Sequence, residues 1–134
     1  MRTLRFEGNN HDVLIQGNNI YGQIAHGVRI DSKGSPFPSD TFVITGNNFY
    51  NNRIDTDHIA IKVDAGTYNG ALDATNNWWG SSTGPSGDGP GTGDGISGNG
   101  ASVTFSPWAA SPVVNRQAPF RGAPSRMEAM IEAE

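Results

Sequence analysis

The chain has 134 residues, of which 35% are hydrophobic, and its formal net charge of −4 comes from scattered acids. It contains no cysteine, which excludes disulfides, thiolate nucleophiles and cysteine-based metal sites. The basic residues form no cluster for nucleic acid, and no apolar run approaches the roughly 18 residues of a membrane-spanning helix. We therefore expect neither nucleic acid nor a membrane as a partner. The 18 glycines and eight prolines predict short strands joined by frequent turns.

Three ungapped copies of one segment define the first set of expected strands. The copies begin at Val13, Phe42 and Ala71, each 29 residues after the one before. In the first two copies apolar residues alternate before an Asn-Asn pair, which is typical of a strand that ends in a turn. The third copy has Asp73 where the others have isoleucine, so we expect the strand pattern to break there, with Trp78 pointing inward.

A second set of alternating segments follows these copies. It comprises residues 28–31, 61–64 and 103–106, with Leu4 and Phe6 as one further member at the front. Variable loops on a constant strand frame predict an all-β fold, a parallel β-solenoid of about three coils, because each coil bonds only its neighbours. An antiparallel sandwich is the alternative, but it gives no reason for Asn pairs to recur in register. The paired asparagines are expected to form structural ladders between coils; they are Asn18, Asn19, Asn47, Asn48, Asn76 and Asn77.

The remaining segments differ in character. We expect coils over residues 1–112, interrupted by a long loop at 80–101, because that stretch is too rich in glycine to pack. Its Gly-Asp-Gly steps weakly match calcium-binding repeats, so calcium is a hypothesis there; no other metal or cofactor is expected. Residues 113–134 form a tail, and Ser125 followed by Glu128 fits a capping box for a short helix from 126.

The C-terminal half carries a resemblance to a known family. Residues 73–80 read Asp-Ala-Thr-Asn-Asn-Trp-Trp-Gly, and residues 103–108 read Val-Thr-Phe-Ser-Pro-Trp. Together with Thr-Gly-Pro at 83–85 and the Gly-Asp-Gly segment at 93–98, this series resembles the terminal coil of right-handed parallel β-helix proteins of the pectate-lyase-like class. The resemblance covers about residues 4–112. It implies a right-handed parallel β-helix, a closing role for Trp108, and a secreted or cell-surface parent protein, but it brings no catalytic motif.

The localisation of the chain itself is left open by its first residues. Residues 1–10 contain no hydrophobic region of a signal peptide.

Four charged residues of the second strand set are the candidates for catalysis. Arg29 and Asp31 alternate outward, and stacking would place them beside Lys62 and Asp64 of the next coil. Two carboxylates about 5 Å apart match the spacing in retaining glycosidases. The alternative, which we favour, is a ladder in which the bases neutralise the acids on a solvated face.

An outward aromatic stripe is the candidate for substrate binding. Tyr21, Tyr50 and Trp79 each follow an inward residue, and such rings either stack on sugars or on one another. Three histidines lack the spacing of metal ligands and are expected at exposed polar positions; they are His11, His26 and His58.

These observations favour a non-catalytic β-helix module with a structural or interaction role, from the terminal part of a carbohydrate-associated protein. The alternative function is a polysaccharide lyase or glycoside hydrolase of the same class. A stack of three coils has two open ends and only a small hydrophobic core, so we expect a homo-oligomer formed through the coil ends. Polysaccharide is a further candidate partner.

Overall fold

The computed structural model describes residues 3–22, 26–52 and 59–114, and all elements assigned within them are β-strands. Sheet A contains, in spatial order, β1 (Leu4–Glu7), β4 (Val28–Asp31), β7 (Ile59–Val63), β10 (Gly93–Ser97) and β9 (Pro85–Gly87). Sheet B contains β11 (Ser102–Thr104), β8 (Ala71–Asp73), β5 (Phe42–Thr45) and β2 (Val13–Gln16). Sheet C pairs β3 (Asn19–Tyr21) with β6 (Asn48–Tyr50).

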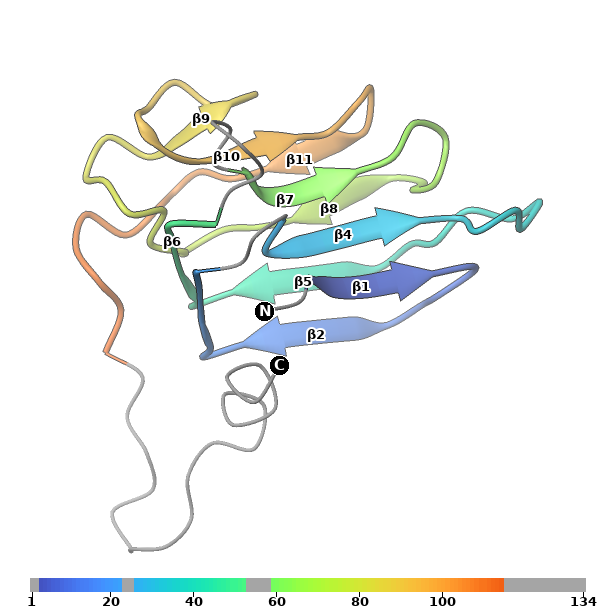
Figure 1. Cartoon of the computed structure of the whole chain (residues 1–134), viewed down its shortest axis with the longest axis horizontal. Coiled ribbons are helices and arrows are strands. Elements are labelled where there is room, and N and C mark those ends of the chain that lie inside the picture. Colours follow the sequence, from blue (N-terminus) through green and yellow to red (C-terminus); the bar gives the residue numbers. More distant parts are fainter. Residues whose placement is uncertain (1–2, 23–25, 53–58, 115–134) are drawn as a thin grey trace, which may run out of the picture.

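The chain passes through sheets B, C and A in turn and then repeats the circuit, so that successive circuits lie on one another (Figure 1). All the paired strands run parallel. The expected all-β fold with parallel strands is therefore confirmed, and the antiparallel sandwich is wrong for the described strands. The additional strand expected at Leu4 and Phe6 is also confirmed, because β1 pairs with β4.

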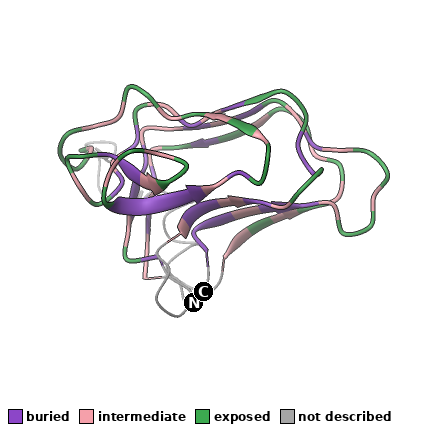
Figure 2. Ribbon diagram, turned by 90° about the horizontal axis from the view of Figure 1, so that it is seen from above, coloured by how far each residue is buried: buried purple, intermediate pink, exposed green. Residues whose placement is uncertain are grey.

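The core lies between the sheets and is built from the inward residues of each strand. β5 alternates between buried and half-buried residues, as the sequence pattern predicted. Figure 2 shows the buried residues along the strands and the exposed ones mainly in the connecting segments. The fully buried large side chains are Ile15, Ile20, Val28, Ile30, Phe42, Ile44, Phe49, Ile61, Leu72, Trp79 and Ile96.

The third circuit is shifted by one residue from the 29-residue spacing, so the expected break at Asp73 is wrong. Val43 pairs with Asp73, which places Leu72 and Ala74 at the inward positions. Asp73 turns away from the core and accepts hydrogen bonds from Thr75. The apolar alternation of sheet B therefore continues into the third circuit.

The shift has its origin at the corner between sheets B and C. Gly17, Gly46 and Asn76 occupy this corner with φ of 71°, 67° and 63°, in the left-handed region. Asparagine tolerates this region better than most residues, so Asn76 takes the place of a glycine. Alignment by identity instead matched the Asn-Asn pair of the third copy with the earlier pairs, one residue out of register.

The same shift exchanges the roles of the two adjacent tryptophans. Trp79 is fully buried and stacks on Phe49, with ring centroids 5.1 Å apart and an interplanar angle of 16°. Trp78 is half-buried and bridges to Asn48 at the edge of sheet C. The predictions that Trp78 points inward and that Trp79 points outward are both wrong.

Residues 80–101 are not a loop throughout, because they contain β9 and β10. Ile96 pairs with Ile61 and is buried, so β10 provides the third circuit of sheet A. Glycine allows this packing: a Cβ on Gly93 would lie 2.2 Å from the carbonyl oxygen of Trp79. Residues 103–106 do not form the next strand of sheet A as expected, since β11 pairs with β8 in sheet B.

A buried ladder of asparagine side chains joins the three circuits. Asn47 Oδ1 accepts hydrogen bonds from the backbone N–H and Nδ2 of Asn18, at 2.9 and 3.2 Å. Asn77 Oδ1 accepts the same pair of bonds from Asn47, again at 2.9 and 3.2 Å. A second rung, from Asn48 Nδ2 to Asn19 Oδ1, lies beside it. The structural role of these asparagines is confirmed: five of them form the ladder, and Asn76 forms the left-handed corner.

The C-terminal closing segment packs as the aromatic residues predicted. Trp108 lies against the core and donates a hydrogen bond from Nε1 to the Ser82 carbonyl at 3.1 Å. Its ring contacts Gly84, where a Cβ would lie 2.7 Å from Trp108 Cε2. The helix expected from residue 126 lies outside the described residues. Within the described part of the chain, no helix long and apolar enough to cross a membrane is found.

Candidate functional site

An open pocket of about 680 Å³ lies beside the point where the third circuit enters sheet A. Its walls come from the ends of β6 and β7, from Trp79 and Gly80, and from the parallel strands β9 and β10 with the segment between them. This volume is within the range of pockets that hold small ligands. Most of the wall is the glycine-rich segment that was predicted to be a loop.

Two of the three predicted aromatic binding residues line this pocket. Tyr50 and Trp79 are both part of its wall, although Trp79 is a buried residue of the core. Tyr21 lies outside the lining and stacks in parallel on Tyr50, with ring centroids 4.9 Å apart. The aromatic stripe therefore consists of two tyrosines. Gly80 ends it, since a Cβ there would lie 3.4 Å from Tyr50 Cβ.

Two carboxylates that sequence reasoning missed as site residues also line the pocket. Asp94 is 5% exposed, and its Oδ2 accepts hydrogen bonds from the backbone N–H and Nδ2 of Asn52, at 2.8 and 3.0 Å. Asp88 is exposed and accepts a hydrogen bond from the Gly98 N–H at 2.8 Å. Their only signal in the sequence was the Gly-Asp-Gly pattern, which pointed to calcium. Among the described residues, no group of three or more His, Cys, Asp or Glu side chains could hold a metal.

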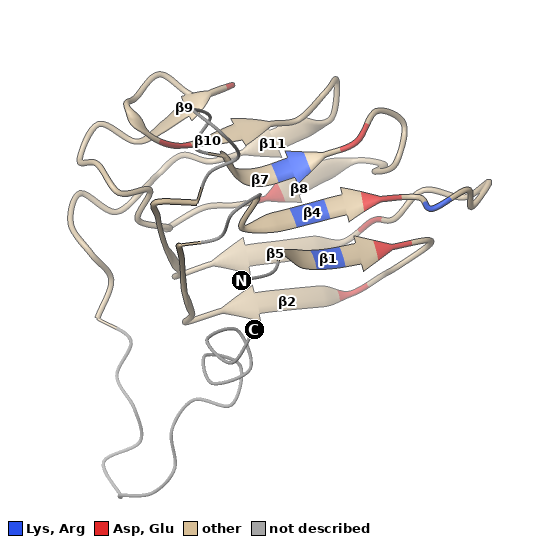
Figure 3. Ribbon diagram, in the orientation of Figure 1, with Lys and Arg blue, Asp and Glu red and all other residues tan. Residues whose placement is uncertain are grey.

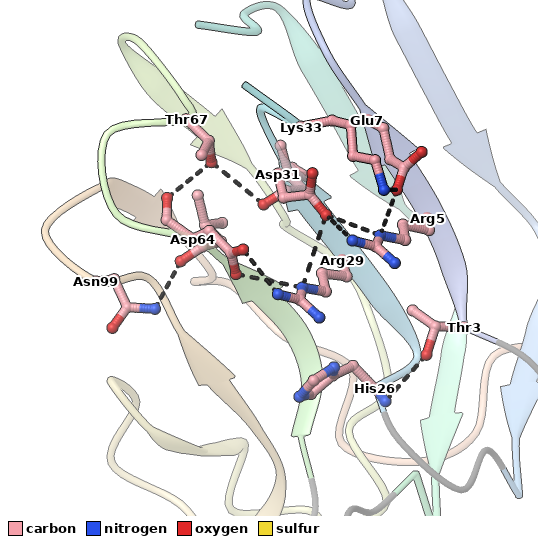
Figure 4. A network of polar contacts seen from close by, with 12 residues as sticks. Thr3, Arg5, Glu7, His26, Arg29, Asp31, Lys33, Asp64, Thr67 and Asn99 are labelled. Carbon is pink, nitrogen blue, oxygen red and sulfur yellow. Dashed lines mark hydrogen bonds and ion pairs between the residues drawn. The ribbon is translucent and has the colours of Figure 1, made fainter. Parts of the chain in front are cut away.

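The four predicted catalytic residues lie together on the outer face of sheet A (Figure 3). Arg29 is in register with Lys62, and its Nη2 lies 2.8 Å from Asp64 Oδ2. Its Nε lies 3.9 Å from Asp31 Oδ2, so Arg29 stands between the two acids. Figure 4 shows this arrangement from close by.

The same diagonal pairing repeats one circuit earlier. Arg5 is in register with Arg29, and Glu7 with Asp31. Arg5 Nη2 lies 2.6 Å from Asp31 Oδ2, and Arg5 Nε lies 3.0 Å from Glu7 Oε2. Each arginine therefore reaches the acid of the following circuit (Figure 4). This is the neutralised ladder that we favoured over a catalytic pair, although its bases are Arg5 and Arg29 rather than Arg29 and Lys62.

The ladder ends at the third circuit. Ser97 is in register with Lys62, and Asn99, two residues later, donates from Nδ2 to the Val63 carbonyl at 2.6 Å. Within the described strands no acid follows Asp64 at this place. Lys62 is therefore left without the diagonal partner that Arg29 has.

Two of the three histidines are described, and one contradicts the prediction of an exposed position. His26 is 6% exposed, beside sheet A (Figure 4). Burial lowers the pKa of His26 below its usual 6.5, and the nearby positive charges of Lys62 and Arg29 add to the shift.

His11 is exposed, as predicted, and bonds to Asp40 Oδ1 at 2.8 Å and Asn9 Oδ1 at 2.9 Å. Its hydrogen bond lowers the pKa of Asp40, with a further contribution from Thr41. His58 lies outside the described residues.

No family model, no curated protein and no solved structure matches this chain.

Proposed function

We propose that this chain is a right-handed parallel β-helix module that binds carbohydrate without catalysing its cleavage. The observation that carries the proposal is the pocket whose lining includes two aromatic residues, Tyr50 and Trp79, and two carboxylates, Asp88 and Asp94. Its place in a secreted or cell-surface protein is the expectation that follows from the family resemblance.

The chemistry of the pocket wall suits a sugar. An aromatic ring offers an apolar face for the C–H groups of a pyranose, and carboxylates accept hydrogen bonds from its hydroxyls. Tyr50 stacks in parallel on Tyr21, which lies outside the pocket lining. Strand β10 supplies a further part of the wall, in which Gly93 and Gly95 carry no side chain.

The ladder supports a role without catalysis. Retaining cleavage needs one free carboxylate as nucleophile and a second that carries a proton at the working pH. Asp31 is instead 5% exposed and bound by Arg5, and Asp64 is bound by Arg29 through two nitrogens, at 2.8 and 3.3 Å. Both acids are thus engaged in ion pairs with neighbouring arginines.

The proposal is tested by titrating the full chain with cellohexaose, mannohexaose and oligogalacturonate while tryptophan fluorescence and calorimetric heat are followed. Binding of at least one probe is expected, and Tyr50→Ala and Asp88→Asn should each weaken it by roughly tenfold or more. Tyr21→Ala is the matched control, because it removes the same ring stacking from outside the pocket. Absence of binding across the panel, or equal loss in Tyr21→Ala and Tyr50→Ala, would refute the pocket as the site.

One observation favours a second candidate function, a glycoside hydrolase. Asp88 and Asp94 line a single pocket, and glycosidases use two carboxylates in this way. Release of reducing ends from the same probes by the parent chain, and its loss in Asp88→Asn and Asp94→Asn, would establish hydrolysis. Asp31→Asn and Asp64→Asn, measured beside them, decide whether the ladder takes part, since equal activity in parent and variants excludes it.

A further inference from the structure

The first circuit presents two strand edges that no described strand covers. In sheet A, β1 pairs only with β4, and in sheet B, β2 pairs only with β5. Leu4 and Val13 donate their N–H groups into these sheets, at 2.9 and 3.1 Å. Because successive backbone groups of a strand point to opposite sides, those of Arg5 and Leu14 point away from the sheets.

A buried acceptor lies at the same face. Asn18 is 1% exposed, and its Oδ1 has no hydrogen-bond partner. The equivalent oxygens of Asn47 and Asn77 each accept two hydrogen bonds from the circuit before. A buried acceptor without a donor costs about 1 to 3 kcal/mol. The first circuit therefore lacks a donor that the other two have.

The opposite end of the described fold is protected in ways that the first circuit is not. Its edge strands are three residues long, β9 starts at Pro85, and Pro107 follows shortly after β11. Proline and short length prevent a strand edge from pairing with another chain. Trp108 packs over Gly84 at this end. By contrast, β1 and β2 are four residues long and contain no proline.

We infer that the open face of β1 and β2 binds a second copy of this chain, face to face about a two-fold axis. Among the described strands, unprotected edges lie at one end alone, so identical faces meet and the assembly closes as a dimer rather than growing into a filament. In this arrangement β1 lies antiparallel to its counterpart. With Phe6 opposite the same residue of the second copy, Arg5 faces Glu7 on both sides of the axis, and opposite charges across a strand pair are favourable.

The dimer also covers apolar side chains that the single copy leaves half-buried. Leu4, Phe6 and Val13 pack against the core but remain partly accessible. Their position at the end of the stack means that a second copy would complete their burial. The open face of β1 and β2 contributes no residue to the carbohydrate pocket, so association can be measured without any ligand.

Sedimentation equilibrium of the full chain over a wide concentration range tests the proposal. We expect a monomer–dimer equilibrium. Leu14→Pro should raise its dissociation constant by roughly tenfold or more, because proline removes an N–H that points outward and leaves the bonds to β5 intact. Leu14→Ala is the matched control and should leave the constant unchanged, since it alters the side chain and keeps the N–H.

A charge change at Glu7 provides an independent arm if Leu14→Pro disturbs the fold, as circular dichroism would show. Glu7→Arg should weaken the dimer, because it places like charges opposite each other, and Glu7→Gln, which brings no repulsion, should weaken it much less. A monomer at all concentrations, an assembly larger than a dimer, or equal association of Glu7→Arg, Glu7→Gln and the parent chain would overturn the proposal.

Discussion

Removal of the central asparagine of the ladder tests whether this buried row of amides holds the circuits together. In Asn47→Ala, the N–H of Asn18 loses its acceptor, and the carbonyl of Ile15 loses a donor at 2.9 Å. Each buried polar group left without its partner costs about 1 to 3 kcal/mol, so the free energy of unfolding should fall by roughly 2 to 6 kcal/mol. The total stability of a domain is only about 5 to 15 kcal/mol, so the loss is large.

Urea unfolding, followed by circular dichroism and tryptophan fluorescence, measures this loss. Gln16→Ala is the matched control, because it removes an exposed amide from the neighbouring strand β2 and should change stability by no more than about 0.5 kcal/mol. If Asn47→Ala unfolds at the same urea concentration as Gln16→Ala, the ladder does not stabilise the fold and the reasoning is wrong.

Three further predictions concern pH, backbone conformation and the charged ladder. The pKa of His26 is lower in the folded chain than its usual 6.5, so the unfolded chain binds the proton more readily and stability should fall as pH drops below 6.5. In urea midpoints measured between pH 7.5 and 5, His26→Gln should reduce this dependence on pH. Gly84→Ala (φ +92°) should lower the free energy of unfolding by about 1 to 2 kcal/mol for its left-handed backbone and by about 1 to 3 kcal/mol more for overlap with Trp108, and it should shift tryptophan emission. Gly66→Ala (φ +73°) has nothing within 4 Å of the added Cβ and should show only the backbone cost. Arg5→Met should lower the free energy of unfolding, measured by thermal melting, by about 1 to 3 kcal/mol, because Asp31 is then left with Arg29 at 3.9 Å. Lys33→Met should have almost no effect in the same experiment, because the Lys33 side chain is 67% exposed.

The circuits of sheets A and B could be predicted up to the point where the repeat changed. Alternation in residues 13–16 and 42–45 indicates strands because each second residue is buried, and this property is local. The prediction for the third copy was wrong because the copies were aligned by residue identity, whereas the register follows the backbone conformation at the corner. Asn76 and Gly46 share a left-handed backbone, yet they are different residues.

The candidate site was predicted only in part. Tyr50 was found because it follows an inward residue in the repeated segment, and the ladder of Arg29 and Asp64 follows from strand register. Asp88 and Asp94 were missed because the glycines around them predict a loop. Glycine in fact allows β10 to approach Trp79 closely, and no local pattern distinguishes these two uses of the residue.

The sequence by itself determined the short strands and the turns between them, because each depends on neighbours within a few residues. The tertiary structure decided which residue of a pair faces the core, as with Trp78 and Trp79, since one extra residue in a circuit moves every later side chain to the other face. It also decided that the glycine-rich segment packs into sheet A and encloses a pocket, because that outcome depends on backbone contacts with residues far away along the chain.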